Sequence, residues 1–148
     1  MKTQIPEEIK EWAFWLSSGI LGEEKLPLCP WAKKSILEGL VEYYEKENPE
    51  DLVPLPEGIK VRIVSFPEIS HRELIEIRNR CNRNLEEWIF LDSHPEDEET
   101  IGGVKSVFKS PLILIQSRKE LEEARDILKR SKYYSYWNSN ALEEILSL

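Results

Sequence analysis

The sequence predicts a single α+β domain over residues 1–148, built on a small sheet of three or four strands with helices largely on one face. One observation is a set of three short segments that suit strands: residues 59–65 alternate, with Ile59, Val61 and Ile63 on one face, and residues 88–91 and 111–116 are continuous apolar runs. The other is the helical spacing of apolar residues in the segments between them: 6–18, 30–47, 70–85 and 118–128. The order strand, helix, strand, strand, helix suggests a ferredoxin-like second half.

Two N-terminal helices are expected to pack on this sheet. In the first, Ile9, Trp12 and Leu16 fall on one face, with Gly19 just past its end. The second is predicted to run from Pro30 to about Glu47 on a broad apolar stripe and to stop before Pro49: Ala32, Ile36, Leu37, Leu40, Val41 and Tyr44.

Two capping boxes mark the starts of the later helices. Ser70 with Glu73, and Ser117 with Glu120, have the spacing in which a serine side chain caps the helix amides. The helix from Ser70 buries Leu74, Ile77, Cys81 and Leu85, so Cys81 is expected in the core and His71 in the exposed first turn. A last short helix should follow Asn140.

Composition narrows the range of functions. The chain has a formal net charge of -8, which argues against a nucleic-acid-binding surface, and the arginines at 78, 80 and 83 are expected on a solvated helix face. No apolar run approaches the roughly 20 residues of a membrane-spanning helix. The N-terminus lacks the apolar core of a signal peptide, and two cysteines make no disulfide framework, so a cytoplasmic protein is expected. The oligomeric state is not indicated.

Cys29 stands before a proline that can open a helix. Proline fits the first helical position, which places Cys29 at or beside the N-cap, where free amides and the helix dipole favour a thiolate. Lys33 and Lys34 add positive charge in the first turns and are candidate contacts for an anionic substrate, together with the neighbouring Trp31. Alternatively, Cys29 is a small apolar residue that packs under Trp31.

His94 and Asp92 are the second group of candidates. Both follow a buried strand and open a long polar connection that runs to residue 110, and long loops at strand ends often carry sites. With one residue between them, the two side chains project on one face of an extended chain, so Asp92 could orient His94 as a base or share a metal with it. Lys105, beside Gly102 and Gly103, is a further candidate contact for an anionic substrate; the spacing does not fit a phosphate-binding loop.

Four motifs, taken in order, resemble a group of small bacterial and phage proteins of unknown function. They are the segments 29–34 (Cys-Pro-Trp-Ala-Lys-Lys), 90–95 (Phe-Leu-Asp-Ser-His-Pro), 111–116 and 133–137 (Tyr-Tyr-Ser-Tyr-Trp). The resemblance implies that Cys29, His94 and the aromatic segment belong together, and it implies no activity. The first motif is also similar to glutaredoxins, but Ala32 stands where their second cysteine lies, which excludes dithiol exchange.

Three hypotheses follow. The leading one is a small enzyme with Cys29 as nucleophile, His94 as base and Asp92 as its orienting carboxylate, acting on a small molecule. The second is a protein that binds a transition-metal ion through the same three residues. The third is a non-catalytic interaction module in which Cys29 only packs.

Overall fold

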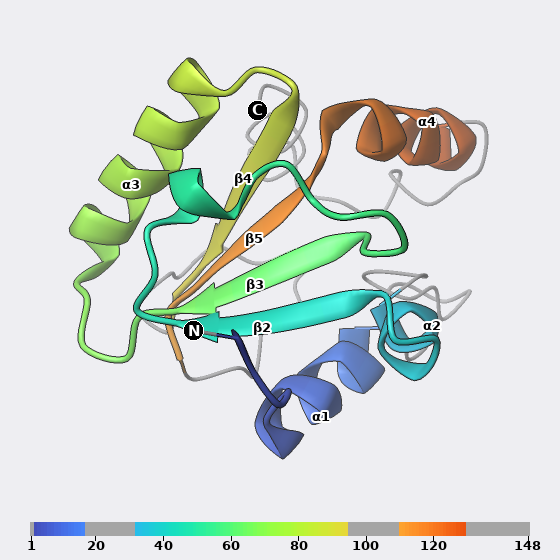
Figure 1. The fold of residues 1–148 in the computed structure, drawn as a ribbon, viewed down its shortest axis with the longest axis horizontal. Helices are drawn as coiled ribbons and strands as arrows, with labels where there is room; N and C mark the ends of the chain where they lie inside the picture. Colours follow the sequence, from blue (N-terminus) through green and yellow to red (C-terminus); the bar gives the residue numbers. More distant parts are fainter. Residues whose placement is uncertain (1, 17–31, 95–109, 130–148) are drawn as a thin grey trace.

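The computed structural model describes residues 2–16, 32–94 and 110–129, which form a five-stranded mixed sheet with helices packed on it (Figure 1). The strands are β1 (Lys2–Thr3), β2 (Val41–Glu45), β3 (Val61–Ser65), β4 (Trp88–Ser93) and β5 (Leu112–Ser117). The helices are α1 (Glu7–Leu16), α2 (Ala32–Leu37), the 3-10 helix η1 (Pro49–Leu52), α3 (His71–Asn84) and α4 (Arg118–Lys129). The α+β class is confirmed, whereas the expected three or four strands are too few.

The strands lie in the order β1-β2-β3-β5-β4. β2 is parallel to β3, and the other neighbouring pairs are antiparallel. β5 therefore separates β3 from β4, which run in the same direction, and α3 connects them as a split β-α-β unit. This connection brings the carboxyl ends of β3 and β4, and the start of α3, to one edge of the sheet.

The predicted helix from Pro30 to Glu47 is wrong in its second half, because α2 ends at Leu37 and β2 follows. Gly39 takes a left-handed φ of 70°, its amide donates to the Ile36 carbonyl at 3.2 Å, and the Leu40 amide donates to the Ser35 carbonyl at 2.9 Å. These two bonds form a Schellman motif, which stops a helix. Val41, Tyr43 and Tyr44 are β-branched or aromatic and suit a strand, so the helical spacing of this stripe was a coincidence.

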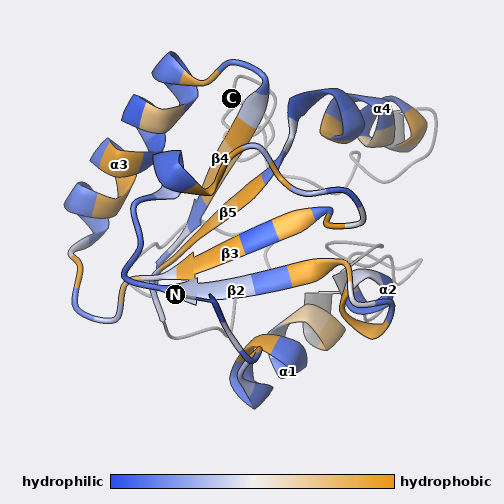
Figure 2. Ribbon diagram, in the orientation of Figure 1, coloured by the Kyte–Doolittle hydropathy of each residue, from blue (hydrophilic) through white to orange (hydrophobic). Residues whose placement is uncertain are grey.

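Helices cover both faces of the sheet, which corrects the expectation of one covered face. Neighbouring residues of a strand point to opposite faces. On β3, Val64 packs in one core cluster with Leu74 and Cys81 of α3, whereas Ile63 packs in another with Ile9 and Trp12 of α1. Figure 2 shows apolar residues concentrated on β3, β4 and β5, while polar and apolar residues alternate along α3.

The later elements agree with the sequence. The Ser70 hydroxyl accepts a bond from the Glu73 amide at 3.2 Å and caps α3, and Ser117 accepts from the Glu120 amide at 3.4 Å at the start of α4. Cys81 is fully buried, as predicted. In the described part of the chain, no helix has the length and apolar character needed to span a bilayer.

Candidate functional site

The chain has two histidines, and they lie against each other. His71 opens α3 and His94 directly follows β4; their ring centroids are 5.2 Å apart and the rings are inclined by 27°, a stacked arrangement. They are 23 positions apart in sequence and meet because the start of α3 lies beside the carboxyl end of β4. This edge of the sheet is where open α/β sheets generally bind ligands.

Asp92 places a carboxylate beside this histidine pair. Its side chain is 7% exposed, and its two oxygens face different partners. Oδ1 accepts a bond from Arg78 Nη1 at 2.5 Å, and Oδ2 lies 4.0 Å from Nε2 of His71. The carboxylate is thus fixed on one side by a cation and turned on the other towards an imidazole.

Arg78 is itself held in place. Its Nε and Nη2 donate to the side-chain oxygen of Asn79 at 3.1 and 3.0 Å, and its side chain is 9% exposed. The sequence placed this arginine on a solvated face; in the structure it forms a buried ion pair with Asp92. It lies seven residues after His71, two turns along the same helix face, so α3 presents both groups to the end of β4.

His94 is buried, with 8% of its surface exposed. Its Nε2 lies 2.9 Å from the carbonyl oxygen of Ile69, in the segment that leads into α3. A carbonyl oxygen only accepts hydrogen bonds, so Nε2 of His94 carries a proton and donates it. This bond holds the His94 ring in its stacked position against His71.

His71 is the more accessible of the two rings, with 28% of its side chain exposed. Its Nε2 is buried and has no hydrogen-bond partner among the residues that the structure describes. Oδ2 of Asp92 lies 4.0 Å from this nitrogen. Catalytic hydrogen bonds are often long in a protein without substrate and tighten when substrate binds. The arrangement of carboxylate and imidazole can therefore orient a base.

The structure describes only some of the other predicted site residues. Cys29, Trp31 and Lys105 lie outside the described residues, as does the aromatic segment 133–137. Lys33 lies with its Nζ 5.5 Å from the centre of the Phe14 ring, and Lys34 pairs with Glu38 at 3.9 Å on the surface of α2.

The surroundings of Cys81 make its thiol unreactive. Burial raises the pKa of its thiol to about 11, and the nearby charge of Glu50, whose Oε1 lies 3.9 Å from the sulfur, acts in the same direction. A thiol with so high a pKa forms little thiolate near neutral pH. Cys81 is therefore an internal reference for a cysteine that does not react in the folded protein.

Metal coordination receives no support from the residues between 32 and 94 or from the other described segments. Within them, no three side chains of histidine, cysteine, aspartate or glutamate are grouped so that they could hold a metal ion. The predicted ligand set also needs Cys29, which lies outside the described residues.

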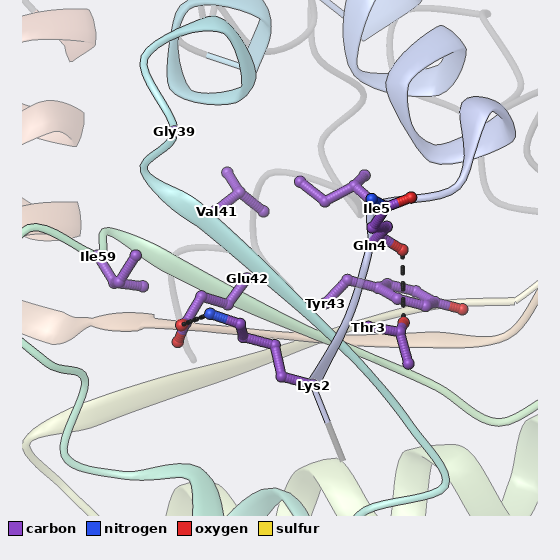
Figure 3. A pocket seen from close by; sticks show the side chains of 9 residues that line it. All are labelled: Lys2, Thr3, Gln4, Ile5, Gly39, Val41, Glu42, Tyr43 and Ile59. Atoms are coloured by element: carbon purple, nitrogen blue, oxygen red, sulfur yellow. Dashed lines mark hydrogen bonds and ion pairs between the residues drawn. The ribbon is translucent and has the colours of Figure 1, made fainter.

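A groove of about 420 Å³ runs along β2 beside β1 (Figure 3). It is lined by Lys2, Thr3, Gln4, Ile5, Gly39, Val41, Glu42, Tyr43 and Ile59. Its charged groups are paired, since Lys2 Nζ donates to Glu42 at 3.2 Å and Arg62 binds the same carboxylate at 2.8 Å. The groove lies at the opposite edge of the sheet from β4, so it is separate from the histidine pair.

Comparison of the chain with family models, with curated proteins and with solved structures finds no match. The resemblance to small bacterial and phage proteins stays a prediction.

Sequence reasoning missed His71 and Arg78 as members of this site. The capping box at Ser70 fixed the start of α3, and the parallel course of β3 and β4 then requires that start to lie beside the residue after β4. The parallel course of β3 and β4 comes from the structure, so the sequence carried a signal for the start of the helix but not for the contact between the two histidines. Arg78 carried a signal in its spacing, since it lies four residues after Leu74 and three before Cys81 on the buried face of α3, but its charge favoured an exposed position.

Proposed function

We propose that this protein is a small enzyme that acts on a small molecule through an imidazole acid-base site at the carboxyl end of β4. Asp92 orients an imidazole, which the sequence assigns to His94, and Cys29 supplies the nucleophile. Lys33, Lys34, Trp31 and Lys105 remain the proposed contacts for the substrate.

The observation that carries this proposal is the meeting of the two histidines with a carboxylate that is 7% exposed. A structural ion pair needs only Arg78 and Asp92. The second carboxylate oxygen faces an imidazole that is partly open to solvent, and this is the arrangement that activates a base in nucleophilic catalysis.

The test is the reactivity of Cys29 with iodoacetamide between pH 5 and 10, located by mass spectrometry of the digested protein. A synthetic peptide of residues 25–35 has the same local sequence without the fold and is the matched control. We expect Cys29 in the protein to react at least about tenfold faster than the peptide near pH 6, because a thiol pKa lowered by one unit gives about tenfold more thiolate there.

Cys81 reports folding in the same experiment, since it stays unmodified while the protein is folded. Replacing both histidines in His71→Gln/His94→Gln should reduce the rate at Cys29 towards that of the peptide. Equal rates in the folded wild-type protein and the peptide at every pH would contradict an activated cysteine and favour the non-catalytic hypothesis.

A further inference from the structure

We infer that His71, rather than His94, is the acid-base group of the proposed site, and that Asp92, Arg78 and His94 are positioning residues for its ring. This assignment rests on the proposed function and changes the role of the residue that the sequence favoured. The two histidines differ in exposure: His94 is buried, whereas 28% of the His71 side chain is exposed. A group that exchanges a proton with a bound small molecule has to reach that molecule.

The Nε2 atoms of the two rings face different groups. Nε2 of His94 donates to the Ile69 carbonyl, so this nitrogen is committed to the backbone. Nε2 of His71 is buried and faces Oδ2 of Asp92. When Nε2 of His71 carries its proton towards the carboxylate, the lone pair lies on Nδ1, the other polar atom of this partly exposed ring.

Arg78 and Asn79 hold the Asp92 carboxylate in place. Arg78 binds Oδ1 of Asp92 and is held by Asn79, which leaves Oδ2 turned towards His71. His94 stacks on the His71 ring and limits its rotation. The His71 ring therefore has the Asp92 carboxylate beside its Nε2 and the His94 ring stacked against its face.

The probe is diethyl pyrocarbonate, which acylates an unprotonated imidazole nitrogen. The acylation rates of the two rings are compared at pH 8. We expect His71 to be acylated at least about threefold faster than His94 in the wild-type protein, as its larger exposed fraction implies. A rate at His94 equal to or above that at His71 would overturn the assignment.

Asp92→Asn should lower the acylation rate of His71 at least about threefold, because loss of the carboxylate changes which ring nitrogen holds the proton. Glu76→Gln is the matched control: it removes an exposed carboxylate from the same helix, paired with Arg72 at 3.4 Å, and should leave the rate unchanged. An unchanged rate in folded Asp92→Asn would show that Asp92 does not orient His71.

One measurement uses the wild-type protein and does not depend on the folding of Asp92→Asn. Nitrogen-15 spectra of the wild-type imidazoles should show His71 protonated at Nε2; a proton on Nδ1 instead would contradict the orientation.

The two proposals fail in different ways. Equal reactivity of Cys29 and the peptide removes the proposed enzyme and leaves the His71 acylation data as they are. Faster acylation of His94, with Cys29 still activated, removes only the assignment of His71.

Discussion

Two arginine–carboxylate pairs lie on the same face of the sheet, and the difference between them separates a structural ion pair from a candidate site. Glu42 of β2 and Arg62 of β3 are direct neighbours in the parallel register, with Nε and Oε1 2.8 Å apart. Asp92 of β4 and Arg78 of α3 form the other pair. Both pairs are largely buried, with side-chain exposures of 12 and 15% in the first pair and 7 and 9% in the second.

The partners of each pair differ. Arg62 also donates to the backbone carbonyls of Leu52 and Pro54, at 2.7 and 3.4 Å, so it ties η1 and the segment after it to the sheet. Among the described residues, the oxygens of Glu42 face two cations, Arg62 and Lys2. Asp92 instead divides its oxygens between a cation and an imidazole. A carboxylate whose neighbours are all permanent cations can only hold the fold together, whereas one beside an imidazole can also help to move a proton.

Removal of Arg78 should give the largest effect. Arg78→Met leaves the Asp92 carboxylate buried without its cation, and we expect it to lower the free energy of unfolding by about 3–4 kcal/mol, measured by urea denaturation. Arg78→Lys keeps the charge but not the fork of the guanidinium, and a smaller loss is expected. A loss below that of Arg62→Met would reverse the order of the two pairs.

Arg62→Met should follow, with a loss of about 2–3 kcal/mol, because the pair is more exposed but two backbone carbonyls also lose a donor. Arg72→Met is the control, since this arginine pairs with Glu76 at a side-chain exposure of 90%, and a change within about 0.5 kcal/mol is expected. The histidine acylation rates should be unchanged in Arg62→Met. A changed rate at His71 would show that the two clusters are coupled.

Asn82→Ala tests whether α3 is anchored to β4 independently of the ion pair. The Asn82 side chain donates to the Phe90 carbonyl at 2.9 Å and accepts from the Phe90 amide at 2.8 Å, on the open side of edge strand β4. Loss of two hydrogen bonds should cost about 2 kcal/mol in urea denaturation. It also exposes a strand edge, so concentration-dependent association is expected in sedimentation experiments. A monomeric variant of wild-type stability would contradict this role.

Much of the second half of the fold could be predicted from the sequence, and the site only in part. The strand–helix–strand pattern, the Ser70 cap and the burial of Cys81 follow from short-range spacing, which one sequence displays directly. β2 could not be separated from the helix before it, because its apolar residues also fit the helical stripe; Gly39 was the available signal. The meeting of His71 with His94 depends on how α3 returns the chain to the sheet, and local patterns do not express such a contact.

The smallest expected effect is the pH dependence of the Glu42 pair. Burial alone would raise the pKa of Glu42, but the hydrogen bonds and charges of Arg62 and Lys2 outweigh it and lower the pKa in the folded protein. A carboxylate with a lowered folded pKa binds protons more weakly folded than unfolded, so it stabilises the fold above its unfolded pKa of about 4.3. This contribution is lost as the pH falls through the folded pKa.

Glu42→Gln removes that titration. We expect the difference in free energy of unfolding between the wild-type protein and Glu42→Gln to be largest at pH 6–7 and to shrink as the pH falls from about 5 to 3, measured by urea denaturation at each pH. Glu57→Gln, in the exposed segment before β3, is the matched control for the loss of a carboxylate. A constant difference across this pH range would mean that the charge of Glu42 contributes nothing, and the first pair would then hold the sheet through the backbone bonds of Arg62 alone.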